Sequence, residues 1–172
     1  MSSPFQLDLF RYVLGELGTD DLPDISLRAM MSGADSLTLA ALAGAAPCEG
    51  PVERRFLFDR ALAELGLALP TVREAVATMR DVRAAEVVAG TLSPVAAATA
   101  MHQLREALEW PEARAENAAG GDLGLGVFTS VYYTYDDCNE DWADPGMRLR
   151  LDAEVREECE AIVRAAQTKA SG

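Results

Sequence analysis

Residues 93–109 decide the fold, and they read SPVAAATAMHQLREALE. Ser93 can accept a hydrogen bond at a helix N-cap, and Pro94 suits the first helical position because the amide hydrogen that it lacks would have no partner there. Apolar residues at spacings of three and four line one face of the resulting helix, namely Ala97, Met101, Leu104 and Leu108. The stretch therefore predicts an amphipathic α-helix that buries one stripe.

The same signals recur along most of the chain. Caps, prolines and terminal glycines predict further helices close to residues 4–17, 25–32, 37–46, 51–65, 71–89 and 148–167. A short polar helix is expected after Pro111. Residues 127–135 have helical spacing, although their β-branched and aromatic side chains would also suit a strand.

We expect an all-α fold, a single irregular bundle of six to eight short helices. The chain has 172 residues, the length of one ordinary domain, so residues 1–172 are predicted to form a single helical domain. Strands are not favoured, because the sequence has no Asn-Gly or Asp-Gly hairpin signal and no sustained alternation of apolar and polar residues. A flexible glycine-rich loop is expected at residues 118–126.

The charge balance argues against some classes of partner. Asp and Glu number 28 and Lys and Arg number 15, which gives a net charge of −13. Because nucleic-acid affinity depends on Lys and Arg neutralising phosphates, we expect no nucleic-acid partner. No apolar run approaches the roughly 20 residues that cross a bilayer, so no membrane partner is expected either.

The cysteines and the N-terminal residues indicate the compartment. Cys48, Cys138 and Cys159 are far apart and odd in number, which favours a reducing environment over a disulfide framework. Residues 1–5 lack the basic start and the apolar stretch of a signal peptide. The sequence thus predicts a cytoplasmic protein.

The sequence contains no coherent catalytic motif. His102 is the only histidine, it lies within a predicted helix, and no GxSxG nucleophile motif accompanies it. The glycine run at residues 120–126 reads GGDLGLG and lacks both the order and the preceding strand of a dinucleotide-binding loop. We therefore expect no catalytic residue, no bound metal and no cofactor, and an enzyme is disfavoured.

One incomplete motif for a cation is present. Asp137, Asn139 and Asp141 have the first three spacings of a calcium-binding loop. The motif then fails, because Trp142 stands where the loop needs glycine and Arg148 stands where it needs a bidentate glutamate. A solvated acidic loop is the simpler interpretation, and an irregular cation site stays open.

Residues 132–142 form the most unusual stretch, and they read YYTYDDCNEDW. Three of the four tyrosines and one of the two tryptophans lie in or beside a cluster of five acids that extends from Asp136 to Asp144, with no base among them. Aromatic side chains give rigid contact area and clustered carboxylates attract cations, a combination that suits a basic protein surface. The predicted partner-binding residues are Tyr132, Tyr133, Tyr135, Asp136, Asp137, Glu140, Asp141, Trp142 and Asp144.

Our preferred hypothesis is a non-enzymatic acidic protein, an adaptor, inhibitor or immunity-type protein, that presents this acidic-aromatic face to a basic partner. Core packing is the alternative role for Tyr132 and Tyr135, which have helical spacing. The alternative function is a small enzyme or ligand-binding bundle whose pocket is lined by Tyr132, Tyr135, His102 and acidic residues. A homodimer is a third interpretation, and it would require an exposed apolar face.

The second half of the chain resembles a family of small all-helical bacterial proteins of unknown function. The resemblance lies in residues 84–94, which read AAEVVAGTLSP, in the pattern YxxYDD at residues 132–137, and in residues 160–166, which read EAIVRAA. It implies a helical fold and a cytoplasmic setting, and it implies no activity.

Overall fold

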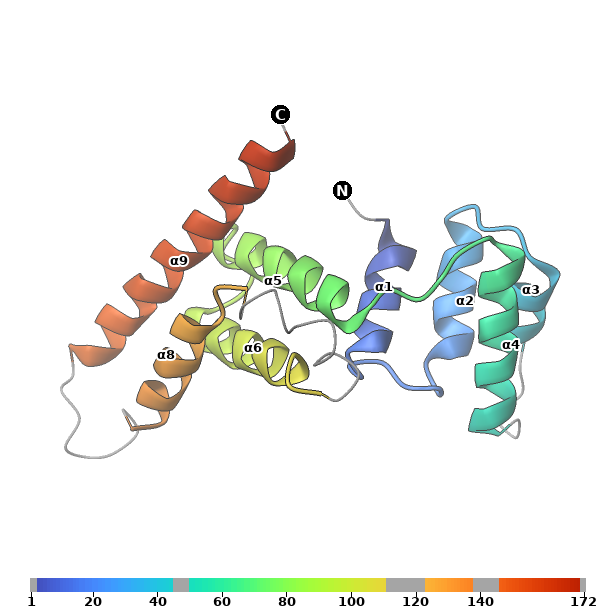
Figure 1. Cartoon of the computed structure of the whole chain (residues 1–172), viewed down its shortest axis with the longest axis horizontal. Helices are drawn as coiled ribbons and strands as arrows, with labels where there is room; N and C mark the ends of the chain where they lie inside the picture. The colour runs from blue at the N-terminus through green and yellow to red at the C-terminus, as the bar shows by residue number, and fades with distance from the viewer. Residues whose placement is uncertain (1–2, 45–49, 111–122, 138–145, 171–172) are drawn as a thin grey trace. The chain divides into compact units, whose positions relative to one another are not determined.

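The computed structural model describes residues 3–44, 50–110, 123–137 and 146–170 (Figure 1). Within these ranges the regular secondary structure is helical and includes no strand. The helices in chain order are α1 (Pro4–Val13), α2 (Leu22–Met31), α3 (Leu37–Ala43), α4 (Pro51–Glu64), α5 (Val72–Val88), α6 (Pro94–Ala107), α8 (Gly126–Asp137) and α9 (Met147–Ala170). The all-α prediction of six to eight short helices is confirmed for this part of the chain.

The helices group into two compact units, Met1–Ala75 and Val76–Gly172. The first unit contains α1 to α4, and the second contains α6, α8, α9 and most of α5. The expectation of a single domain over residues 1–172 stays a prediction. None of the described helices is both long enough and apolar enough to cross a membrane.

The first unit buries an apolar core between its four helices. α3 lies against both α2 and α4, and α1 lies against α2. The core residues are Phe5, Leu9, Leu22, Ile25, Ala29, Leu39, Leu42, Phe58, Ala61 and Leu62. The ring of Tyr12 meets the ring of Phe58 edge-on, with 5.3 Å between the ring centroids. Removal of this apolar surface from water is the main force that holds the unit together.

α1 is shorter than the sequence predicts. Its helical signal extends to Leu17, with Gly18 as the expected stop, but the helix ends at Val13. Gly15 has a φ angle of +72°, a left-handed conformation that glycine adopts without steric cost and that terminates a helix. The first suitable glycine therefore ends α1, although apolar spacing continues beyond it.

The second unit is organised around α6. This helix packs against α8 and α9, and α8 packs against α9. The Ser93 hydroxyl accepts a hydrogen bond from the Ala96 amide, and Pro94 lies in the first turn, as predicted. The predicted stripe is buried as well, and it consists of Ala97, Met101, Leu104 and Leu108. The buried residues that α8 and α9 add are Phe128, Val131, Tyr135, Leu151, Val155 and Cys159.

The ambiguous residues 127–135 are helical and lie within α8. Phe128, Val131 and Tyr135 are buried at spacings of three and four residues. Burial along one helical face thus outweighs the β propensity of these side chains, which is a weak and context-dependent preference.

The predicted flexible loop at 118–126 is described only in part. Residues 118–122 lie outside the described residues, and residues 123–126 form the turn that enters α8. Leu123 has a φ angle of +58°, which is unusual for a residue with a side chain. Its carbonyl accepts a hydrogen bond of 2.7 Å from the Arg80 guanidinium, and this contact holds the turn in place.

Candidate functional site

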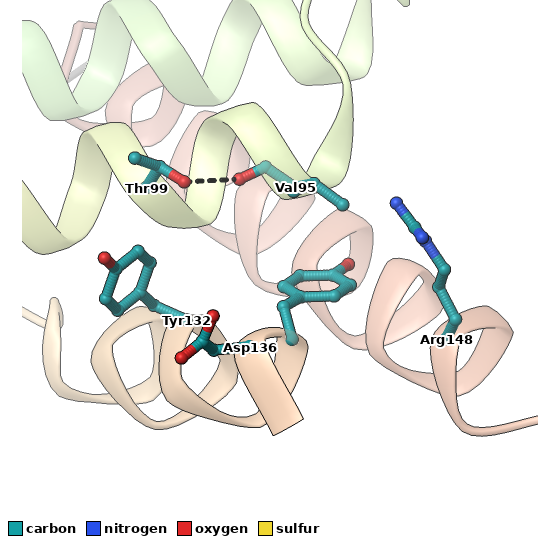
Figure 2. A pocket seen from close by; sticks show the side chains of 6 residues that line it. Val95, Thr99, Tyr132, Asp136 and Arg148 are labelled. Carbon is teal, nitrogen blue, oxygen red and sulfur yellow. Dashed lines mark hydrogen bonds between the residues drawn. The ribbon is translucent and has the colours of Figure 1, made fainter. Parts of the chain in front are cut away.

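A small pocket lies between α6, α8 and α9 in the second unit (Figure 2). Its volume is about 190 Å³. The lining residues are Val95 and Thr99 of α6, Tyr132, Tyr135 and Asp136 of α8, and Arg148 of α9. Residues three or four apart share one face of a helix, which is why single turns of α6 and α8 each supply several of these side chains.

Figure 2 shows how the polar groups of the pocket are arranged. Tyr132 projects from α8 toward the turn of α6 that carries Thr99, Asp136 lies beside Tyr132 on α8, and Arg148 stands apart from them on α9. The Thr99 hydroxyl donates a hydrogen bond of 3.1 Å to the Val95 carbonyl. Because Thr99 is satisfied within its own helix, Asp136 and Arg148 dominate the polarity of the pocket.

Tyr135 joins α8 to α9 at the edge of the pocket. Its ring is buried, and its hydroxyl donates a hydrogen bond of 2.6 Å to Oδ1 of Asp152. Burial, followed by the hydrogen bond and the charge of Asp152, raises the pKa of Tyr135 well above its usual value. Tyr135 therefore stays a neutral donor at physiological pH and cannot serve there as a base.

Three aromatic rings pack beside the pocket. The imidazole of His102 on α6 stacks on the Tyr132 ring, with 4.4 Å between ring centroids and an interplanar angle of 16°. Tyr133 meets both rings edge-on at 5.3 Å. His102 is only 8% exposed, and its buried Nδ1 has no hydrogen-bond partner in the described part of the chain. Its Nε2 lies 3.6 Å from Oε1 of Glu106, which is longer than a hydrogen bond. Ring stacking thus holds His102 against Tyr132.

The last turns of α8 present an exposed surface that we call the acidic end of α8, formed by Tyr133, Asp136 and Asp137. The Tyr133 side chain is 57% exposed, and both aspartates are exposed. Neither carboxylate has an ion-pair or hydrogen-bond partner within the ranges that the structure describes. The final turn of α8 carries no base. Negative charge at a helix C-terminus is unfavourable, because the unpaired carbonyls there already carry a partial negative charge.

The structure describes five of the nine predicted partner-binding residues. Tyr133, Asp136 and Asp137 are exposed, Tyr132 is half-buried, and Tyr135 is buried. The other four lie outside the described residues, and they are Glu140, Asp141, Trp142 and Asp144. Burial gives Tyr135 a packing role, which is the alternative that its helical spacing left open.

Sequence reasoning placed Tyr132, Tyr135 and His102 together in its alternative function, and these side chains do lie in one region of the second unit. It did not anticipate Val95, Thr99 or Arg148 as neighbours of Asp136. Arg148 drew attention only as the residue that breaks the calcium motif. No local signal relates it to Asp136, since the two side chains come from different helices.

The described residues also bear on metal binding. Within the described ranges, no group of three or more His, Cys, Asp and Glu side chains is arranged to hold a metal ion. Of the incomplete calcium motif, Asp137 is the only ligand position that lies in these ranges, and Asn139 and Asp141 lie outside them. The interpretation of that motif as an irregular cation site therefore stays a prediction.

Comparisons with protein-family models, curated proteins and solved structures give no match to this chain. A function therefore has to be argued from the geometry of α8 and its neighbours. The acidic end of α8 and the pocket beside it are the two features that carry such an argument.

Proposed function

We propose that this chain binds a basic protein partner through the acidic end of α8, as an adaptor, inhibitor or immunity-type protein. The observation that carries the proposal is the pair of exposed carboxylates, Asp136 and Asp137, in the last turn of α8. A cationic partner would relieve both their mutual repulsion and their unfavourable interaction with the helix C-terminus.

The aromatic side chains support the same proposal. Tyr133 exposes a large ring beside the carboxylates, and tyrosine is among the residues enriched at protein interfaces. Its neighbour Tyr132 is fixed by the stack with His102. A ring that is already held in place loses little conformational entropy when a partner binds, so this surface is preorganised for contact.

The charge of the whole chain would assist association. A net charge of −13 attracts cationic molecules over distances close to the Debye length, about 8 Å at physiological ionic strength. The sequence that follows α8 contains three more acids, Glu140, Asp141 and Asp144. We expect binding to weaken as salt is added, because exposed charges are screened.

The test is capture of proteins from a lysate of the source cells on three immobilised forms of the full chain. The forms are the wild type, the double variant Asp136→Asn with Asp137→Asn, and the control Glu154→Gln with Glu157→Gln. Both variants remove two negative charges, and the control residues are exposed on α9. Capture by simple ion exchange would fall equally in both variants, so the control separates a site from bulk charge.

We expect a basic protein that the wild type and the control retain and that the Asp136 and Asp137 variant loses, with an affinity reduced about tenfold or more. Elution of that protein should shift to lower salt in the variant. Equal retention by all three forms, or equal loss in both variants, would contradict the proposal.

A further inference from the structure

The pocket between α6, α8 and α9 has the size of a small-metabolite site. Its volume of about 190 Å³ is below the roughly 300–1,000 Å³ of pockets that bind drug-sized ligands. A single ion would leave much of this space unfilled, whereas a molecule of the size of a dipeptide suits it.

Among the described residues that line it, the pocket carries one charge of each sign. Asp136 contributes a carboxylate from α8, and Arg148 contributes a guanidinium from α9. Neither forms an ion pair within the part of the chain that the structure describes, and Figure 2 shows the two side chains well separated on different helices. The pocket therefore offers two separate charges, and each can attract the opposite charge of one ligand.

The two ends of the pocket differ in the groups that they offer to a ligand. Tyr132 lies one turn before Asp136 on the same helical face, and an aromatic ring face attracts cations. At the other end, the Arg148 guanidinium forms no ion pair among the described residues and can meet a ligand anion. A guanidinium can hold a carboxylate with two parallel hydrogen bonds.

We infer that this pocket binds a small zwitterion of the dipeptide class, with its ammonium group against Asp136 and Tyr132 and its carboxylate against Arg148. A simple cation would leave Arg148 without a partner, and a simple anion would leave Asp136 without one. This site shares Asp136 with the protein-binding surface proposed above, but its second charged group is Arg148 of α9, and the inference does not depend on that proposal.

Glycylglycine is a suitable probe, because each of its charges can be removed separately. N-acetylglycylglycine keeps only the carboxylate, and glycylglycinamide keeps only the ammonium group. The three compounds are titrated into the full chain and followed by the chemical shifts of backbone amides in α6, α8 and α9. We expect glycylglycine to bind saturably and about tenfold more tightly than either blocked form.

Two variants test which charged group of the ligand Asp136 and Arg148 each bind. The Asp136→Asn variant should bind glycylglycine no more tightly than N-acetylglycylglycine. The Arg148→Gln variant should bind glycylglycine no more tightly than glycylglycinamide. The matched controls are Glu157→Gln and Arg164→Gln, both at exposed positions of α9 outside the pocket wall. Both controls should bind glycylglycine as the wild type does.

Three results would overturn the inference. The first is the absence of saturable glycylglycine binding at millimolar concentration. The second is equal affinity for the free and the blocked dipeptides. The third is a loss of affinity in the controls as large as in the pocket variants, because binding would then follow net charge.

Discussion

The hydroxyl of Tyr135 donates a hydrogen bond of 2.6 Å to the carboxylate of Asp152, and this contact ties α8 to α9. Of the two residues, Tyr135 lines the pocket of the candidate site. Tyr135 is buried, whereas Tyr133, two residues earlier on another face of α8, is exposed.

Replacement of Tyr135 with Phe should destabilise the second unit by about 1–2 kcal/mol, because it removes a hydrogen bond to a charged acceptor and keeps the buried ring. Urea-induced unfolding followed by circular dichroism measures the loss. Tyr133→Phe is the matched control, and it should change stability by less than about 0.5 kcal/mol since that side chain is exposed. Equal effects of the two substitutions would show that the contact with Asp152 does not stabilise the unit.

Replacement of Asp137 with Asn should stabilise the chain by about 0.3–1 kcal/mol, because it removes a negative charge from the C-terminal turn of α8. Glu154→Gln, an exposed change within α9, serves as the control for net charge. A gain in stability together with a loss of partner binding would be the trade-off expected of a functional residue. A destabilised variant would instead indicate that Asp137 has a stabilising partner.

Glu64 should make the first unit sensitive to acid. Its carboxylate accepts hydrogen bonds from the Thr38 hydroxyl (2.5 Å), the Ser36 hydroxyl (2.7 Å) and the Thr38 amide (3.2 Å). These bonds lower the pKa of Glu64 from 4.5 to about 2, and the bond from the Thr38 hydroxyl has the largest effect.

Because the folded pKa is depressed, the unfolded chain takes up a proton first as the pH falls. The stability that Glu64 contributes is therefore fully present above pH 4.5 and is lost as the pH falls toward about 2. Urea unfolding between pH 4.5 and about 2 gives the free energy of unfolding of the wild type and of Glu64→Gln. The difference between these two free energies should shrink as the pH falls. If the difference in free energy of unfolding stayed constant over this pH range, the hydrogen bonds from Thr38 and Ser36 would not depend on the negative charge of Glu64.

The thiol of Cys159 should be unreactive in the folded chain. Burial, with a smaller effect from the charge of Glu158, raises its pKa from 9.0 to about 11. Two pH units correspond to about a hundredfold less thiolate at neutral pH, and burial slows access further.

Labelling with a thiol-specific disulfide reagent, in a variant with Cys48→Ser and Cys138→Ser, isolates this thiol. The reaction should be slow in the folded chain and fast in denaturant. Rapid labelling of the folded chain would show that α9 opens readily around Cys159.

The sequence predicted the local structure of the second unit closely. The cap at Ser93 and the buried stripe of α6 were predictable, because each depends on residues within a few positions of one another. The helical state of α8 was not, because its β-branched and aromatic residues suited a strand as well as a helix. The end of α1 was predicted less well, since apolar spacing continues past Gly15 while the backbone conformation of that glycine stops the helix.

The acidic-aromatic stretch was only partly interpretable in the same way. Its composition marked it as unusual, but alternation of buried and exposed positions along α8 assigns different roles to adjacent tyrosines. Tyr133 faces water and Tyr135 faces the core, although both belong to the same run of residues. The predicted contribution of the four residues beyond α8 stays a prediction.

By itself, the sequence determined that the chain is helical and where most of its helices begin, because caps, prolines and apolar stripes act through hydrogen bonds and contacts within one or two turns. The tertiary structure alone decided that Arg148 shares a pocket with Asp136, that His102 stacks on Tyr132, and that Tyr135 bonds Asp152. These pairs join different helices, and their meeting depends on how three helical faces pack together, a relationship that the spacing within any one helix does not encode.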